Sequence, residues 1–264
     1  MKSHIWAAGK WRRLGLIRKP VPAERARLAL ARVAPTQPLI MTVPGMPPVL
    51  DQGDLGSCAD NMGDELMEFC GLKNEGQLAD YSRLALYYWV RQQAGLPLDQ
   101  DTGSSIWDVI STLESLGVCY ESTWPYNPAQ FAVKPSDAAV AEAAKHKAIL
   151  AFHLPDVMTI DAALEQLFPV GFGVTLNESF ESIGSDGIYL PSGEIIGGHA
   201  MVIYGCDDTK QAGGYTGFYL VRNSWSASWG ANGDCWIPKM LFDDNTAGEA
   251  ATIRRAMPCT DSSP

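Results

Sequence analysis

Residues 197–225 read GGHAMVIYGCDDTKQAGGYTGFYLVRNSW and contain two apolar stretches on either side of the Gly213-Gly214 pair. Short runs rich in aliphatic and aromatic residues that flank a glycine turn predict a β-hairpin. In such a hairpin the start of the first strand lies beside the end of the second. The pattern therefore predicts that His199 and Asn223 are neighbours at the open end of an antiparallel β region.

The two halves of the chain carry different secondary-structure signals. Helices are expected at residues 58–72, 80–96, 104–118 and 158–168, with a helical turn or two within 134–146, and further strands at residues 170–176, 187–191 and 234–239. In the first helix, Met62, Leu66, Phe69 and Cys70 are spaced to share one face. A mainly helical half followed by a mainly β half indicates an α+β fold with two lobes, and a cleft between lobes is a usual place for a site.

The composition is that of a globular protein. The 264 residues are 46% hydrophobic and 19% charged, which excludes a disordered chain. No apolar run is long enough to span a bilayer, and the N-terminus has positive charge without a continuous apolar stretch. We expect no membrane insertion, and a location in the cytoplasm or export by a route without a standard signal peptide.

Charge is distributed unevenly along the chain. Residues 1–34 hold nine Lys or Arg and one Glu, whereas the rest holds eleven Lys or Arg and 29 Asp or Glu. The basic arm either docks on the acidic body or remains a solvated tail. Prolines at positions 35, 38, 44, 47 and 48 predict an extended conformation after the arm. Nucleic acid is not an expected partner, because the acidic body would repel phosphates.

Metal and disulfide signals are weak. The six cysteines include no C-x-x-C pair, and the four histidines lack the spacing of zinc ligands. We expect most thiols to be reduced and structural, and we predict neither a metal site nor a cofactor.

Cys58 stands out from the other cysteines because it follows Gly53, Gly56 and Ser57 at the start of a predicted helix. A helix N-terminus and a histidine partner both favour the reactive thiolate. His199 could act as the base and Asn223 could orient its ring. Gln52, together with the Cys58 backbone N–H, could hold the negative oxygen of a tetrahedral intermediate. Each residue alone has an ordinary structural explanation, but the ordered set Gln, Cys, His, Asn points to a thiol nucleophile.

Four stretches together resemble the papain-like cysteine peptidases: residues 51–58 (DQGDLGSC), 101–126 (DTGSSIWDVISTLESLGVCYESTWPY), 197–206 (GGHAMVIYGC) and 221–236 (VRNSWSASWGANGDCW). The resemblance covers roughly residues 45–260. It implies a two-lobed α+β fold with a helical left lobe and an antiparallel, β-barrel-like right lobe. The implied domain is residues 45–264, with a helical lobe at about 52–145 and a β lobe at about 146–264. Residues 1–44 would be a basic, proline-rich extension and a possible short pro-segment.

The resemblance also implies roles for individual residues. Cys58 would be the nucleophile, His199 the acid and base, Asn223 the orienter, and Gln52 part of the oxyanion hole. Trp225 would shield the contact between His199 and Asn223, and the backbone of Gly103 and Ser104 would bind an extended peptide. The candidates for a side-chain pocket are Ser105, Ile106, Gly173 and Ala200.

Three positions depart from the usual family pattern. Leu55 and Asp101 stand where the family often has bridging cysteines, and Ala59 stands where an aromatic residue usually follows the nucleophile. The missing disulfide favours a reducing compartment or a bacterial-like branch of the family. Ala59 leaves room for a wider cleft.

The expected activity is hydrolysis of peptide bonds through an acyl-thioester on Cys58, with a peptide or protein as substrate. The alternatives are a catalytically silent papain-like module that binds peptides or a partner protein, and a thiol acyltransferase. We further expect residues 1–44 to cover the site in part and to restrain activity, with an unstructured leader as the alternative.

Overall fold

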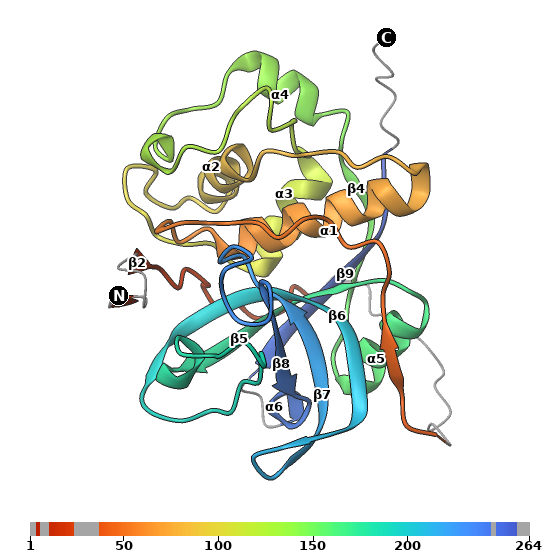
Figure 1. Ribbon diagram of the computed structural model, residues 1–264. Helices are drawn as coiled ribbons and strands as arrows, with labels where there is room; N and C mark the ends of the chain where they lie inside the picture. The colour runs from red at the N-terminus through yellow and green to blue at the C-terminus, as the bar shows by residue number, and fades with distance from the viewer. Residues whose placement is uncertain (1–3, 6–10, 24–36, 244–246, 258–264) are drawn as a thin grey trace.

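The structure is a computed structural model that describes residues 4–5, 11–23, 37–243 and 247–257. Helices gather on one side of the molecule and an antiparallel sheet on the other (Figure 1). The helical side holds α1 (Cys58–Glu75), α2 (Arg83–Gln93), α3 (Ile106–Ser115) and α4 (Asp137–Ala143), with a 3₁₀ turn at Pro128–Gln130. This arrangement confirms the predicted α+β class. The lobe and extension boundaries given above stay predictions.

Short polar side chains fix the starts of these helices. The hydroxyl of Ser82 accepts the Ala85 N–H at the start of α2, at 3.2 Å. Ser105 and Ser136 cap α3 and α4 in the same way. Such caps satisfy backbone donors that have no partner within the helix. The end of α1 is set by Gly76, whose φ of 71° is a left-handed conformation that favours glycine.

Helix α1 lies at the centre of the molecule and is buried on all sides over residues 58–71. The strands β6 (Ile195–Ala212) and β9 (Ala247–Ala256) cover one side of it, and α2 and α3 cover the other. Burial thus extends beyond the face that Met62, Leu66, Phe69 and Cys70 share. The helix carries Asp60, Asp64, Glu65 and Glu68 into the interior, where sequence alone would place them in solvent.

The main sheet has the order β4-β9-β5-β6-β7-β8, with β3 paired to the outer part of β6, and all its pairs are antiparallel. The remaining strands are β3 (Ile40–Thr42), β4 (Ala148–His153), β5 (Val170–Asn177), β7 (Tyr215–Arg222) and β8 (Asp234–Pro238). A separate two-stranded pair joins β1 (His4–Ile5) and β2 (Trp11–Arg12). The predicted hairpin is confirmed: β6 and β7 pair from Ala212 and Tyr215 at the turn to Val202 and Arg222 near the open end.

The strand predicted at residues 187–191 is wrong. Within it only Ile188 forms an isolated bridge, to Trp236. Strands β4 and β9 have no counterpart in the prediction. The predicted helix at residues 158–168 corresponds to α5 (Val157–Glu165), and two short turns complete the lobe, η2 (Glu178–Phe180) and α6 (Met240–Asp243).

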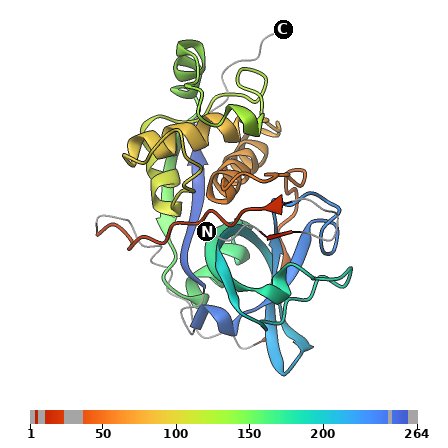
Figure 2. The ribbon, with the colours of Figure 1, turned by 90° about the vertical axis from the view of Figure 1, so that its left-hand side faces the viewer.

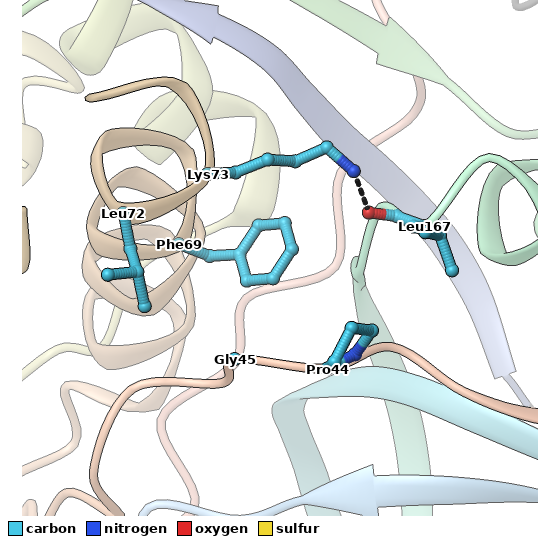
Figure 3. A pocket seen from close by; sticks show the side chains of 6 residues that line it. All are labelled: Pro44, Gly45, Phe69, Leu72, Lys73 and Leu167. Atoms are coloured by element: carbon cyan, nitrogen blue, oxygen red, sulfur yellow. Dashed lines mark hydrogen bonds between the residues drawn. The ribbon is translucent and has the colours of Figure 1, made fainter. Parts of the chain in front are cut away.

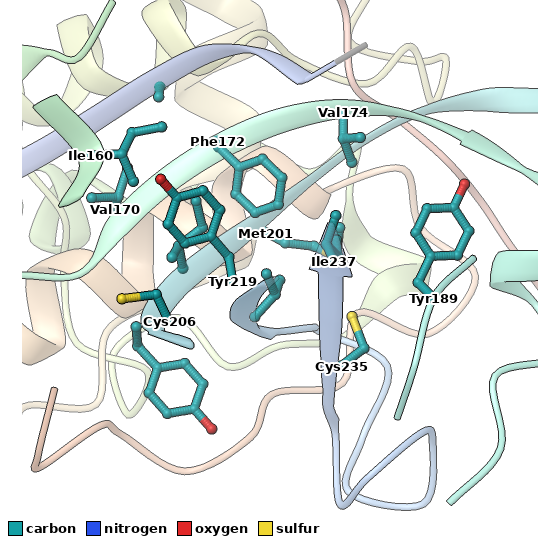
Figure 4. Packing of buried hydrophobic residues seen from close by; sticks show 14 of the residues in the cluster. Ile160, Val170, Phe172, Val174, Tyr189, Met201, Cys206, Tyr219, Cys235 and Ile237 are labelled. Carbon is teal, nitrogen blue, oxygen red and sulfur yellow. The ribbon is translucent and has the colours of Figure 1, made fainter. Parts of the chain in front are cut away.

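Two apolar clusters hold the fold together. One fills the β lobe, where Phe172, Met201, Tyr219 and Ile237 meet from four strands (Figure 4). The other joins α1 to the sheet. Burial of apolar surface of this kind is the main favourable contribution to folding. Among the described residues, no helix has both the length and the apolar character that a membrane span requires.

A surface pocket of about 350 Å³ lies at the C-terminal end of α1 (Figure 3). Its lining consists of Pro44, Gly45, Phe69, Leu72, Lys73 and Leu167. The ammonium of Lys73 crosses it and donates to the carbonyl of Leu167 at 2.6 Å. The pocket is therefore at the opposite end of α1 from Cys58.

Candidate active site

Cys58 is the first residue of α1 and is fully buried. Burial raises the pKa of its thiol to about 11. The backbone N–H groups of Ala200 and Gly15 face the sulfur and act in the opposite direction, because hydrogen bonds to the thiolate favour the charged form. The sulfur is therefore contacted by both the β lobe and the N-terminal part of the chain.

His199 and Asn223 meet across β6 and β7 as the hairpin predicts. The Nε2–H of His199 donates to Oδ1 of Asn223 at 2.8 Å, and both side chains are buried. This bond fixes the tautomer, so Nδ1 keeps its lone pair. Nδ1 has no hydrogen-bond partner among the described residues. Burial lowers the pKa of His199 to about 4, with the bond to Asn223 acting in the opposite direction.

Strand β6 comes close to the Cys58 sulfur one residue after His199. Ala200, the next residue of β6, points its N–H at Cys58. Trp225 packs on the imidazole with ring centroids 5.0 Å apart and is almost completely buried. Phe180 adds a second ring at 6.0 Å. Sequence reasoning missed Phe180, because a lone aromatic residue in a turn carries no pattern.

Gln52 is held from both ends of its amide. Its Oε1 accepts the hydroxyl of Ser224 at 2.7 Å, and its Nε2 donates to the carbonyls of Leu55 at 2.8 Å and Arg13 at 3.2 Å. Ser224 follows Asn223 in the chain and thus connects Gln52 to the pair formed by Asn223 and His199. Sequence reasoning did not assign Ser224 a role, although it lies within the Asn-Ser-Trp element. The Nε2 donor predicted for an oxyanion already holds a carbonyl oxygen of the chain itself.

Residues 13–19, called here the docked segment, run between the two lobes. In Figure 2 this red part of the chain crosses below the helices and above the sheet. Leu16 N–H donates to Gly198 O at 3.2 Å, Ile17 N–H donates to Ser104 O at 2.8 Å, and Ser104 N–H donates to Gly15 O at 3.0 Å. The docked segment therefore pairs with Ser104 in the parallel sense.

The docked segment approaches the protein so closely that two glycines are required. A Cβ at Gly15 would lie 1.9 Å from the carbonyl oxygen of Gly56. A Cβ at Gly103 would lie 1.9 Å from the carbonyl oxygen of Gly15, and Gly103 also has a φ of +81°. Gly103 thus provides space, and its N–H donates to the Tyr87 hydroxyl at 3.0 Å; Ser104 provides the backbone hydrogen bonds.

Leu16 fills the pocket that the sequence predicts for a side chain. It is 9% exposed, and a Cβ at Gly173 would meet its Cδ2 at 2.7 Å and Ile106 Cδ1 at 3.4 Å. Ala200 belongs to the same apolar cluster. The hydroxyl of Ser105 instead accepts the Asp108 N–H at 3.1 Å as the cap of α3. Of the four pocket candidates, Gly173 and Ile106 therefore lie at the Leu16 side chain, Ala200 belongs to the same cluster, and Ser105 caps α3.

Acidic side chains anchor both ends of the docked segment. Arg13 pairs with Asp101, Lys19 Nζ lies 2.6 Å from Asp108 Oδ2, and the Lys19 N–H donates to Glu249 Oε1 at 2.7 Å. For this part of the basic arm, docking is observed rather than a solvated tail. The predicted extension, residues 1–44, also includes 1–3, 6–10 and 24–36, which lie outside the described residues.

The described residues contain no group of three or more His, Cys, Asp or Glu that could hold a metal ion. Within the same residues the cysteines are free and buried: Cys58, Cys70, Cys119, Cys206 and Cys235.

Comparison with known proteins identifies the family. The papain family of cysteine proteases matches residues 43–250. An uncharacterized peptidase C1-like protein of Acanthamoeba polyphaga mimivirus is 33% identical over 226 residues, which cover 80% of this chain and 70% of that protein.

Solved structures show the same fold. Xylellain, a cysteine protease from Xylella fastidiosa, superposes with a TM-score of 0.78 at 26% identity, over 91% of this chain and 95% of that one. The procathepsin B S9 of Trypanosoma congolense gives a TM-score of 0.72 at 14% identity, over 90% of this chain and 85% of that one.

Proposed function

Because this chain belongs to the papain family of cysteine proteases, we propose that it hydrolyses peptide bonds with Cys58 as nucleophile and His199 as acid and base. The observation that supports these roles is the orientation of the imidazole. Asn223 occupies Nε2, which leaves Nδ1 as the basic nitrogen, and the next residue along β6 contacts the sulfur. Gln52 is the side-chain donor for the oxyanion.

The proposed reaction has two halves. Nδ1 of His199 takes the thiol proton, and the sulfur attacks the peptide carbonyl carbon. The carbonyl oxygen becomes negative and accepts hydrogen bonds from Gln52 Nε2 and the Cys58 backbone N–H. The C–N bond breaks, the imidazolium gives its proton to the departing amine, and a thioester remains on Cys58. Water, deprotonated by Nδ1, then attacks the thioester, and the free acid and the thiol are released.

We propose in addition that the docked segment holds the enzyme in a latent state. The carbonyl of Arg13 takes the donor intended for a substrate oxygen, and Leu16 fills the side-chain pocket. The same burial keeps the thiol and the imidazole neutral, with pKa values of about 11 and about 4. Proenzyme forms among the structural relatives are consistent with self-inhibition.

The test of hydrolysis uses the full-length chain, both unchanged and with Gly15→Ala, which should displace the docked segment. An epoxysuccinyl peptide should label the Gly15→Ala chain at Cys58, and that chain should release free acid from a short peptide. Labelling that persists at full level after Cys58→Ala would refute the assignment of the nucleophile. Binding of peptides without turnover would favour a silent module, and formation of a new amide from an added amine would favour an acyltransferase.

A further inference from the structure

A second pocket, of about 530 Å³, opens beside the N-terminal end of the docked segment. Its lining consists of Arg13, Asp54, Leu55, Asp101, Pro128, Ala129 and Phe131. The two carboxylates are the acidic groups of this pocket, and Leu55, Pro128 and Phe131 supply apolar walls. The pocket thus combines a negative end with a surface on which a long aliphatic stem could pack.

Asp101 is held in place by the body of the protein and is charge-paired by the docked segment. Both of its oxygens accept the Gly56 N–H at 3.1 Å, and Oδ1 also accepts the Tyr87 hydroxyl. These donors are neutral. The ion pair comes from Arg13, whose Nη1 contacts Oδ2, and the Asp101 side chain is only 9% exposed.

Arg91, a cation beside the Tyr87 ring, is already engaged. The guanidinium of Arg91 lies 4.1 Å from the centre of the Tyr87 ring. Its Nη1 and Nη2 donate to backbone carbonyls of Leu98, Gln100 and Phe131. Arg91 therefore stabilises the loops around the pocket, while Asp101 keeps an oxygen for an incoming cation.

Arg13 shows how one residue can use the oxyanion donor and this pocket together. Its carbonyl accepts Gln52 Nε2 at 3.2 Å, and its guanidinium reaches Asp101. The donor and the pocket therefore lie within the span of one arginine residue, which puts the pocket within reach of a long side chain next to a carbonyl held by that donor. The residue that carries the attacked carbonyl could thus place its own side chain at the Asp101 carboxylate.

We propose that Asp101, assisted by Asp54, is a specificity site for an arginine or lysine of the substrate, at the residue that carries the attacked carbonyl. This proposal rests on the proposed function. When the docked segment leaves, Arg13 leaves with it, and the Gly56 N–H and the Tyr87 hydroxyl remain as neutral donors to the Asp101 carboxylate. A substrate guanidinium restores the charge pairing, whereas an uncharged side chain of similar length does not.

The expected preference is large enough to measure. A charge-assisted hydrogen bond in a partly buried place favours the cationic side chain by about 10- to 100-fold in binding. Asp54 is exposed, so its contribution should be about twofold and should fall with added salt.

The experiment measures binding without turnover, so that failure of the proposed hydrolysis would not affect it. The full-length chain carries Arg13→Gln to remove the internal cation, Gly15→Ala to displace the docked segment, and Cys58→Ala to prevent reaction. Fluorescence anisotropy compares two labelled tripeptide amides that differ only in arginine against glutamine at the last residue. We expect the arginine peptide to bind about 10- to 100-fold more tightly.

Further variants in the same background identify the cause. Asp101→Asn keeps an acceptor for Gly56 and Tyr87 and should reduce the arginine preference to less than about threefold. Asp54→Asn, which is exposed and should not disturb folding, should lower the preference about twofold, and Asp186→Asn at a distant exposed site should leave it unchanged. If Asp101→Asn fails to fold, the test is whether Asp54→Asn lowers the arginine preference while Asp186→Asn leaves it unchanged. Equal affinity for both peptides, or full preference in the folded acidic-site variants, would overturn the proposal.

Discussion

Replacing Gly15 by alanine should release the docked segment from the cleft in the full-length chain. A Cβ at this position would lie 1.9 Å from the Gly56 carbonyl oxygen, which belongs to the backbone just before Cys58 and cannot move freely. Undocking relieves the overlap without disturbing either lobe. The variant therefore probes the latent state without truncation.

The docked segment is held by a small margin. Five of its hydrogen bonds contribute about 1 kcal/mol each, and burial of the Leu16 side chain contributes about 2 kcal/mol. Ordering seven residues costs roughly 1 kcal/mol per residue or more, which nearly offsets these gains. The two ion pairs add about 1 kcal/mol or less apiece. Overpacking of about 1–3 kcal/mol is comparable to this margin and should therefore raise the open fraction by about tenfold.

The assay follows the thiol as well as the activity. With a pKa of about 11, Cys58 has a thiolate fraction of about 10⁻⁴ at pH 7, whereas a hydrated thiol with a pKa near 8.5 has about 3%. Alkylation of Cys58 by iodoacetamide at pH 7, mapped by mass spectrometry, reports the open fraction directly. We expect Gly15→Ala to raise both this rate and peptide turnover by about tenfold, in proportion to each other.

The matched control is Gly184→Ala, a glycine-to-alanine change on the surface of the β lobe, where the nearest atom would be 3.6 Å away. It should alter neither rate. If Gly15→Ala keeps its thermal unfolding temperature and its Cys58 alkylation stays at the unchanged protein's rate, the docked segment does not control access to the sulfur.

Two further substitutions test the site and its supporting helix. Asn223→Ala removes the acceptor of His199 Nε2–H, so kcat in the Gly15→Ala background should fall by about 10- to 100-fold with little change in KM, measured by steady-state kinetics; an unchanged kcat would contradict the orienting role. Burial raises the pKa of Asp64 well above its usual value, so its favourable contribution is complete below pH of about 4 and is lost as the pH rises through the folded-state pKa. Asp64→Asn should therefore increase the free energy of unfolding at pH 8 more than at pH 5, measured by urea denaturation, and equal changes at both pH values would refute this assignment.

The contact between His199 and Asn223 could be predicted because it is local to one hairpin. The turn at Gly213-Gly214 brings the start of β6 to the end of β7 and so His199 near Asn223, although the register shifts twice on the way, between Ile203 and Gly205 and between Asp207 and Gln211. Strand β9 has no such local cause. Its sequence, AGEAATIRRA, has no strand alternation, and it becomes a strand because β4 and β5 supply partners from distant parts of the chain.

Two other features depend on contacts that leave no periodic pattern. Helix α1 has carboxylates at Asp60, Asp64 and Glu68 that indicate a solvent face, but packing between the lobes covers them. Docking of residues 13–19 depends on glycine at position 15, which has no side chain, and on acidic partners from separate parts of the chain. Neither feature forms a sequence pattern that predicts where the segment docks. Charge asymmetry indicated that the arm could dock, but not where.

The Asp101 carboxylate has two roles in this proposal: it pairs with Arg13 in the latent state, and it selects the substrate in the open state. A disulfide in the place of Leu55 and Asp101 would join the two loops without charge, whereas Asp101 joins them by accepting the Gly56 N–H. A carboxylate with little exposure gains from a counter-charge, which Arg13 supplies while the docked segment is in place. Any peptide that displaces the segment must replace that counter-charge or leave the carboxylate unpaired. The contact that stabilises the closed state thus favours basic substrates when the cleft opens.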